Sequence, residues 1–468
     1  MTTLAEQAVG SFRNRLEGRL VTPDDADYDQ VRSLWNGAID HRPALVARCA
    51  GPEDVATALA FAREEHLEIS VRGGGHSFSG ASVCPDGLVV DLGDMNRVEV
   101  DPEARTVRCG AGANLGELDA ATQAYGLAVP GGTVSHTGVA GLTLGGGMGW
   151  LTRRHGLTLD SLLAADVVLA NGSFVRASED ENPDLFWGLR GGGGNFGVVT
   201  TFTFRAHPVG PEVHVGLFFW DMGVSADALR LIGHVVPGLP RATGVLMGVG
   251  MNAPPEPFVP QEHQGKQGHA LIVAGFGTAE EHAEALAPLA DGIPPLFELR
   301  SPMPFTGLQR MLDESAPVGI LSYDKGLTYS ELNEDVIALL DEYLPRKTSP
   351  MSFCPTLHVS GAYTDPDEDA TAFGGLREPM YVMSCSAMSP DPDTLVADIA
   401  WARALWTELT PHAANVGGYV NFMAEFEEDR VRRSYGPEKY DRLARVKATY
   451  DPENVFHRNA NILPAVAI

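Results

Sequence analysis

Apolar runs and helical patterns alternate along the first part of the chain. Residues 45–47 and 67–71 are short apolar runs typical of strands, and the sequence Gly-Pro-Glu-Asp at residues 51–54 lies between them. Proline at the first helical position and acidic residues in the first turn suit the N-terminus of a helix, where the helix dipole is positive. The order of these elements predicts a β-α-β unit.

A hairpin and another helix are expected next. Residues 98–100 and 106–108 have the pattern of two short strands, and residues 101–104 have the composition of a turn between them. Helical periodicity then extends from Leu115 to Tyr125, just before the part of the chain that is richest in glycine.

Beyond residue 206 the glycine clusters give way to strand-like runs such as residues 214–219 and 270–274, which are separated by helices such as residues 280–289. This pattern predicts a second domain built on a mainly antiparallel sheet. Residues 253–268, rich in proline, glutamine and glycine, are expected to form a loop between strands, with a lid as the alternative. A charged helix is expected at residues 437–450.

Composition adds bounds on class and partners. The chain has 468 residues, 44% of them hydrophobic and 20% charged, which predicts a globular protein of two or three domains. A formal net charge of −27 argues against nucleic acid and anionic membranes as partners. There is no apolar run of about 18 residues, and residues 1–18 are too polar for a signal peptide, so a cytoplasmic protein is expected. The sequence carries no signal of its oligomeric state.

Cysteines and histidines form no recognisable set of metal ligands. The five cysteines are scattered and include no Cys-x-x-Cys pair, which disfavours disulfides and cysteine metal sites. The fourteen histidines include no His-Glu-x-x-His motif, and His263 and His269 are expected to point to solvent from a loop. No metal site is predicted.

Two glycine-rich segments carry the candidate chemistry. In residues 71–80, a strand ends in three consecutive glycines that are followed by His76. Such a loop lets successive backbone N–H groups converge on a pyrophosphate, whereas a sharp turn would need only one glycine. Residues 131–150 contain so many glycines that their backbone is expected to lie flat against a large cofactor such as a dinucleotide.

Two other motifs fit their usual chemistry poorly. Residues 192–197 match G-x-G-x-x-G, but a β-rich run follows where a Rossmann fold needs a helix. Ser77 resembles the serine of a nucleophile elbow, but Ser79 stands where the second glycine is required, which disfavours a hydrolase.

Four sequence blocks occur in order along most of the chain. They are R-G-G-G-H-S at residues 72–77, G-L-T-L-G-G-G-x-G-W-L-x-R-x-x-G-L-x-x-D at residues 141–160, D-L-F-W-G-L-R-G-G-G-G-N-F-G-V-V at residues 184–199, and D-P-x-N-x-F-x-x-N-x-N-I-x-P at residues 451–464. With these blocks the chain resembles the vanillyl-alcohol-oxidase superfamily of FAD-linked oxidoreductases, and within it the berberine-bridge-enzyme-like branch.

The resemblance implies an α+β fold in three segments. Residues 1–206 would form a two-lobed FAD-binding domain of the PCMH type, and residues 207–412 a substrate domain with a mainly antiparallel sheet flanked by helices. Residues 413–468 would return to the FAD-binding domain.

The resemblance also implies one covalent bond to the flavin. In this family the histidine after the three glycines forms an 8α-histidyl bond, and His76 occupies that position. A neutral imidazole can attack the 8α carbon, and the bond tends to raise the reduction potential of the flavin. Many members add a second bond from a cysteine, but Val134 stands there, so attachment is expected to be single, as in the 6-hydroxy-nicotine-oxidase-like members. Thr137 stands where the family often has a valine or leucine that affects oxygen access.

The matched motifs imply a set of site residues. Tyr419 and Asn421 lie in a run, residues 417–422, that resembles a family strand facing the flavin, and they are the expected catalytic pair. Tyr419 would orient the substrate or act as a base, or else only pack beside the flavin; a phenol of ordinary pKa, about 10, needs a cationic neighbour to act as a base. The expected cofactor contacts are His76, Arg72, Gly73, Gly74, Gly75, Ser77, Gly132, Ser135, Thr137, Gly138, Gly141, Gly145, Gly146, Gly149, Val199, Asn459 and Asn461.

The implied activity is transfer of a hydride from a CH–OH or CH–NH carbon of a small organic substrate to N5 of covalently bound FAD, with dioxygen as the expected acceptor. A dehydrogenase that uses another acceptor and a catalytically quiet flavin-binding protein are the alternatives. No motif identifies the substrate.

Overall fold

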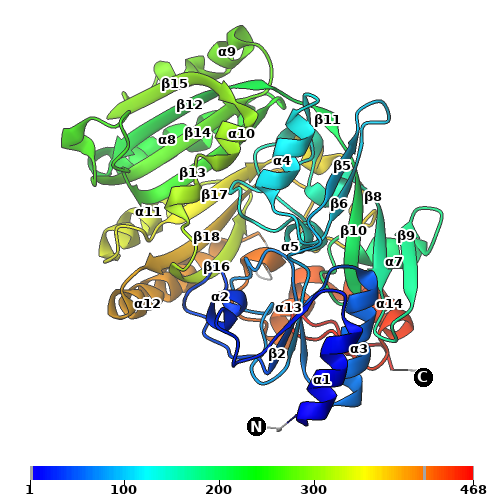
Figure 1. Ribbon diagram of the computed structural model, residues 1–468. Helices are drawn as coiled ribbons and strands as arrows, with labels where there is room; N and C mark the ends of the chain where they lie inside the picture. The colour runs from blue at the N-terminus through cyan, green and yellow to red at the C-terminus, as the bar shows by residue number, and fades with distance from the viewer. Residues whose placement is uncertain (1–3, 415–417, 467–468) are drawn as a thin grey trace.

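The computed structural model describes residues 4–414 and 418–466, and these residues form three main sheets (Figure 1). The first sheet has the strand order β1-β2-β4-β3. Its strands are β1 (Arg19–Val21), β2 (Leu45–Arg48), β4 (Leu88–Asp91) and β3 (Ile69–Arg72), and its helices are α1 (Glu6–Arg15), α2 (Tyr28–Arg32) and α3 (Pro52–Glu64). Strands β2 and β3 both run parallel to β4, which lies between them. The predicted β-α-β unit is therefore confirmed, with one strand inserted between its two strands.

The second sheet is antiparallel and has the order β5-β6-β10-β8-β9. Its strands are β5 (Val98–Asp101), β6 (Thr106–Gly110), β10 (Val198–Arg205), β8 (Leu162–Val168) and β9 (Phe174–Ser178), and the predicted hairpin is β5 with β6. Helices α4 (Leu115–Gln123), α5 (Val139–Gly145), α6 (Thr152–His155) and α7 (Pro183–Leu189) belong to this region, as does the short pair β7 (Leu127–Ala128) and β11 (His207–Pro208). Helix α4 begins at a capping box, because Asn114 and Glu117 each bond the other's backbone N–H.

The third sheet has seven antiparallel strands in the order β15-β12-β14-β13-β17-β18-β16. The strands are β12 (Glu212–Asp221), β13 (Thr243–Asn252), β14 (Gln267–Gly275), β15 (Phe297–Pro304), β16 (Leu321–Tyr329), β17 (Cys354–Val359) and β18 (Met380–Ser389). The helices of this part are α8 (Ser225–Val235), α9 (Ala279–Ala290), α10 (Phe305–Arg310), α11 (Glu334–Tyr343) and α12 (Pro392–Leu409). The predicted antiparallel sheet is confirmed.

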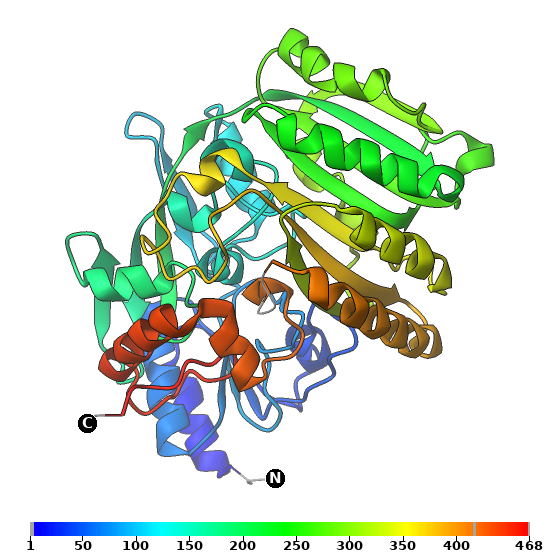
Figure 2. The same ribbon diagram turned by 180° about the vertical axis from the view of Figure 1, so that it is seen from behind.

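The two faces of this large sheet have different neighbours. Alternate residues of a strand point to opposite faces. On β14, Leu271 and Val273 pack in one core with α8, α11 and α12, whereas Ala270 and Ile272 belong to a second core with the glycine-rich region. Figure 2 shows α8, α11 and α12 side by side along the outer face of the sheet. The inner face is thereby turned toward the two smaller sheets.

The C-terminal segment returns to the first part of the chain. Helices α13 (Glu428–Tyr435) and α14 (Pro437–Tyr450) lead to a final extended stretch that packs in the core of the two smaller sheets. The fully buried Lys447 ammonium donates to the Asn195 carbonyl at 2.7 Å, to the Phe456 carbonyl at 3.0 Å and to the Asp451 carboxylate at 2.6 Å. One buried cation thus ties α14 to the last glycine run and to the terminal stretch.

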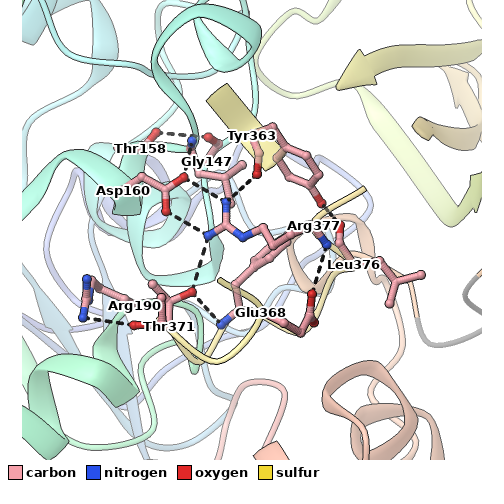
Figure 3. Close-up of polar contacts among 12 residues, drawn as sticks. Gly147, Thr158, Asp160, Arg190, Tyr363, Glu368, Thr371, Leu376 and Arg377 are labelled. Carbon is pink, nitrogen blue, oxygen red and sulfur yellow. Dashed lines mark hydrogen bonds and ion pairs between the residues drawn. The ribbon is translucent and has the colours of Figure 1, made fainter. Parts of the chain in front are cut away.

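A second buried ion pair joins the loop between β17 and β18 to the glycine-rich region. In Figure 3 the Arg377 guanidinium faces the Asp160 carboxylate, with two N–H···O contacts of 2.9 and 2.8 Å. Arg377 also donates to the Tyr363 carbonyl and the Thr371 hydroxyl, while Asp160 accepts from the backbone of Leu157. Such a bidentate pair fixes the orientation of both groups as well as their separation.

Two expectations from the sequence were wrong. His269 does not point to solvent: it lies in β14, where Ser225 pairs with its Nε2 at 2.9 Å and the Gly250 N–H donates to its Nδ1 at 3.3 Å. The residues around Tyr419 do not form a strand, because Val420–Phe422 is a 3₁₀ turn and Gly417 lies outside the described residues. No helix in the described ranges combines the length and apolarity that a membrane span requires.

Candidate active site

A cavity of about 1210 Å³ lies where the three sheets meet. Its wall includes the loop after β3, the glycine-rich loop and helix α5, the last glycine run with β10, the inner face of the large sheet, and the segment from Tyr419 to Phe426. Parts of the chain that are more than 300 residues apart in sequence therefore share one site. Within the described residues, no three histidine, cysteine or acidic side chains lie in a group able to hold a metal.

The two glycine loops cross at contact distance. A Cβ on Gly74 would lie 2.4 Å from the Gly138 Cα, and a Cβ on Gly138 would lie 2.4 Å from the Gly74 nitrogen. Neither position can therefore carry a side chain unless the loops move apart. Gly75 has a φ of +66°, and a Cβ on Gly141 would meet no protein atom within 4 Å. The crossing thus presents bare backbone to the cavity, as a cofactor that lies against it requires.

His76 is held between two rings. Its imidazole stacks on Trp35 with a centroid distance of 4.5 Å and on His136 with a distance of 5.1 Å. Its Nε2 lies 3.2 Å from the His136 Nδ1. Burial, followed by repulsion from His136, lowers the pKa of His76 to about 3, so its imidazole is neutral at physiological pH.

Tyr419 and Asn421 lie beside helix α5. The Tyr419 hydroxyl oxygen accepts from the Gly147 N–H at 2.8 Å and from the Asn421 amide at 2.8 Å, and the same amide donates to the Leu142 carbonyl at 3.1 Å. Tyr419 is 6% exposed, and burial raises its pKa to about 12 despite these donors. The phenol therefore keeps its proton at neutral pH, and this proton is free for a group in the cavity because both bonds are accepted by the oxygen.

Most of the predicted cofactor contacts line the cavity. In addition to His76, these are Gly73, Gly74, Gly75, Ser77, Gly132, Thr137, Gly138, Gly141, Gly145, Val199 and Asn459. Val199 lies on β10, the strand that follows the last glycine run.

Five of the predicted contacts are absent from the described cavity wall: Arg72, Ser135, Gly146, Gly149 and Asn461. Arg72 donates to the Val31 carbonyl, and both the backbone N–H and the hydroxyl of Ser135 bind Asp313, at 2.8 and 2.6 Å. These side chains shape the loops around the cavity. Motif matching could not distinguish them from the wall residues because both kinds lie in the same glycine-rich segments.

Several residues that the structure brings to the site were not expected there from the sequence. Trp35 and Phe78 flank His76, and Phe422 lies between Phe78 and Tyr419 in a row of edge-on rings. Asp324 on β16 lines the cavity although it is only 3% exposed, and it accepts from the hydroxyls of Ser322 at 2.7 Å, Ser384 at 3.1 Å and Ser386. No strand was predicted at residues 321–329, and the charge of Asp324 among the mostly uncharged residues of that run was the one signal that could have singled it out.

The residues at this site fit FAD. The crossed loops offer a surface of bare backbone, and the volume is large enough for a dinucleotide with a small substrate beside it. The side-chain oxygens of Asn459 and Asn461 are buried without any hydrogen-bond partner among the described residues. Buried amide oxygens are rarely left unpaired, so a ligand with N–H or O–H donors is expected beside Asn459, the one of the two that lines the cavity.

Comparisons with known proteins agree with this geometry. Residues 43–178 match the FAD binding domain family, and residues 418–463 match the family of berberine and berberine-like proteins. The chain is 31% identical to an FAD-linked oxidoreductase of Dictyostelium discoideum, covering 98% of each protein. It is 30% identical to (R)-6-hydroxynicotine oxidase of Paenarthrobacter nicotinovorans, covering 96% of this chain and 97% of that one. The crystal structure of 6-hydroxy-D-nicotine oxidase from Arthrobacter nicotinovorans is similar with a TM-score of 0.86 at 27% identity, covering 96% and 98% of the two chains.

Proposed function

Since this chain belongs to the berberine-bridge-enzyme-like branch of the FAD-linked oxidoreductases, we propose that it is an oxidase acting on a CH–OH or CH–NH carbon of a small organic molecule. The observation that carries this proposal is one continuous cavity whose wall joins both glycine loops and His76 to Tyr419 and the inner face of the large sheet. A cofactor and a substrate can meet there away from bulk water. Bound FAD supplies an acceptor for a hydride at N5 and passes the two electrons to dioxygen.

The three segments proposed from the sequence keep their roles in this scheme. Residues 1–206 hold the cofactor, residues 207–412 contribute the sheet that faces the substrate, and residues 413–468 add Tyr419, Asn421 and Asn459 to the wall. The unpaired oxygen of Asn459, which lies in the cavity wall, would accept a hydrogen bond from the cofactor, and the backbone of the crossed glycine loops would bind its pyrophosphate.

A single covalent bond from His76 is part of the proposal. Its neutral imidazole has a lone pair available for the 8α carbon of the flavin, and stacking on Trp35 restricts the ring to one plane. A second bond would need a thiol, but Val134 lines the cavity at the corresponding place and all five cysteines are buried elsewhere. One bond per chain is therefore expected.

Tyr419 is proposed to orient the substrate by donating its hydroxyl proton. A base role is less well supported, since burial raises its pKa and the two groups bonded to its oxygen are neutral N–H donors. Asn421 is then a positioning residue that fixes the phenol from the side of helix α5.

The wall of the substrate side favours an apolar molecule with one polar end. The inner face of the large sheet presents Leu217, Phe219, Leu246, Ile272, Phe297 and Leu357 to the cavity. The polar end is the edge formed by β16 and β18, where Asp324, Ser384 and Ser386 lie on the same face in register. An aromatic alcohol or amine that places its O–H or N–H against Asp324 fits this arrangement, whereas a sugar would leave many hydroxyls unpaired against the apolar wall.

Two experiments test these proposals separately. Acid precipitation of purified protein should leave the yellow flavin in the pellet, and a His76→Ala variant should release it to the supernatant; yellow colour in the wild-type supernatant would contradict the covalent bond. A panel of aromatic alcohols, secondary amines and oligosaccharides, assayed for hydrogen peroxide, tests the oxidase. Flavin bleaching under anaerobic conditions without peroxide in air would indicate a dehydrogenase instead, and neither signal with any compound would favour a quiet flavin-binding protein.

A further inference from the structure

The histidine pair at the edge of the cavity suggests how the covalent bond of the proposed function is made. His76 and His136 come from different loops, and the only nitrogen of His76 that faces His136 is Nε2, at 3.2 Å from Nδ1. The other nitrogen of His76, Nδ1, bonds to no other side chain among the described residues, and it is the nitrogen to which we assign the new bond. A neutral imidazole has one N–H and one lone pair, so the position of the shared proton decides which nitrogen of His76 is nucleophilic.

We propose that His136 acts as the base for flavin attachment: it accepts the Nε2 proton of His76 while the Nδ1 of His76 bonds to the 8α carbon of FAD. This inference rests on the proposed covalent bond. With the proton of His76 on Nε2 and directed at His136, the Nδ1 lone pair is available, and the positive charge that develops on the ring during bond formation is relieved when the proton moves to His136.

The step balances as follows. The Nδ1 atom of His76 replaces one hydrogen on the 8α carbon, and that hydrogen leaves as a proton. The Nε2 proton passes to the Nδ1 of His136. The electron pair of the broken C–H bond remains in the flavin until dioxygen takes it together with the two protons, which gives hydrogen peroxide and oxidised, bound flavin.

The surroundings of His136 suit a fixed base. Its two chain neighbours are tied down, because Ser135 binds Asp313 through its backbone and hydroxyl, and the Thr137 carbonyl accepts from the Leu115 N–H at 3.0 Å. The Nε2 of His136 is buried and has no hydrogen-bond partner among the described residues, so among these residues the ring bonds only to His76.

Trp35 completes the arrangement on the other face of His76. Its indole N–H donates to the Ala316 carbonyl at 2.8 Å, and its backbone N–H donates to the Gly75 carbonyl at 3.0 Å. The His76 ring is therefore confined between a fixed indole and the fixed His136 ring, with 14° and 27° between the ring planes. Confinement of this kind aligns the proton transfer without any further residue.

The test is the rate of covalent incorporation into the full chain. Wild type, His136→Ala and His136→Asn are produced in riboflavin-starved cells, mixed with FAD in air, and sampled over time for flavin fluorescence in denaturing gels and for the mass of the intact chain. We expect both variants first to bind FAD noncovalently and then to form the covalent bond about 100-fold more slowly than wild type. This factor is the lower end of what a positioned base contributes. Added imidazole should speed up His136→Ala but not wild type.

A matched control comes from another stacked histidine pair, His155 with His207, at 4.1 Å between ring centroids. Like His136, His155 has a buried Nε2 without a partner among the described residues, but its ring stacks on His207 and not on His76. His155→Ala should incorporate flavin at the wild-type rate, and melting temperatures of the flavin-free chains should show whether any variant is unfolded.

The outcomes are distinct. Wild-type rates in both His136 variants would overturn the role of His136 and leave the His76 bond standing. Slow attachment that imidazole does not rescue, with a lowered melting temperature, would show that His136 only packs against His76 and would also overturn the proposal. A wild-type chain that never binds flavin covalently would refute the proposed bond itself and His136 with it.

Discussion

The substitution Tyr419→Phe tests whether Tyr419 donates a hydrogen bond to the substrate or acts as a general base, because the two roles predict decreases in kcat/KM of different size. The substitution removes the hydroxyl and leaves the ring in contact with Phe422 and Phe373. If Tyr419 donates one hydrogen bond to the substrate, its loss should cost about 0.5 to 1.5 kcal/mol, or a decrease in kcat/KM of about twofold to 13-fold. Loss of a general base would instead cost about 10²-fold to 10⁴-fold. The structure predicts the smaller effect because burial keeps the phenol protonated at neutral pH.

The same substitution also has a stability cost. The phenol oxygen is the acceptor for the Gly147 N–H and for one bond of the Asn421 amide, so both donors lose a partner in the variant. An unpaired buried donor costs about 1 to 3 kcal/mol. Asn421 keeps its bond to the Leu142 carbonyl, so the larger part of the lost stability should come from the unpaired Gly147 N–H. The melting temperature should therefore fall together with the modest loss of activity.

The assay is steady-state oxidation of the best substrate of the panel between pH 6 and pH 10, with peroxide as the readout. Tyr381→Phe is the matched control, because Tyr381 is fully buried and its hydroxyl has no hydrogen-bond partner among the described residues. A decrease of 100-fold or more in Tyr419→Phe, with loss of an alkaline limb in the pH profile, would refute the donor role. Unchanged kinetics in Tyr419→Phe would show that the ring only packs.

Three further predictions concern cofactor binding and stability. Gly138→Ala should lose most of its FAD, measured by the ratio of flavin to protein absorbance, because its Cβ would lie 2.4 Å from the Gly74 nitrogen; Gly10→Ala, whose Cβ meets nothing within 4 Å, should retain it. Lys447→Met should lower the free energy of unfolding by about 3 to 5 kcal/mol in denaturant titrations, because it leaves the Asp451 carboxylate buried without its cation. Adding Asp451→Asn to that variant should restore part of this free energy. Burial lowers the pKa of His269 to about 4 in the folded chain, whereas an unfolded histidine has a pKa of about 6.5. The unfolded chain therefore binds more protons below pH 6.5, and the free energy of unfolding decreases from there toward pH 4. At pH 5 the decrease is about 2 kcal/mol, and His269→Asn should remove this part of the pH dependence. An equal loss of stability between pH 7 and pH 5 in His269→Asn and wild type would contradict this assignment.

Local patterns in the sequence were sufficient for most elements. Helix α14 begins and ends at the predicted residues, and the β5–β6 hairpin has its turn where the composition indicated. These elements depend on capping, turn chemistry and periodicity, which are properties of neighbouring residues. The error at His269 has the opposite origin: this third residue of β14 was assigned to the loop that precedes the strand, and only the packing of α8 against the sheet shows that the imidazole is inside.

For the site, the sequence by itself determined the cofactor class, the attachment residue to test and the absence of a thiol at Val134, because these depend on contiguous motifs and on residue identity. The tertiary structure alone decided which motif residues reach the cavity and that Arg72 and Ser135 bind other parts of the chain instead. It also brought Trp35 and Asp324 into the cavity wall and placed His136 beside His76. The physical reason is that His136 and Asp324 are 60 and nearly 250 positions away from His76 in the chain. Only the crossing of the two glycine loops and the register of the large sheet bring them to the same site. The sequence identified His76 as the candidate for the covalent bond to the flavin, whereas only the structure shows that His136 lies beside it.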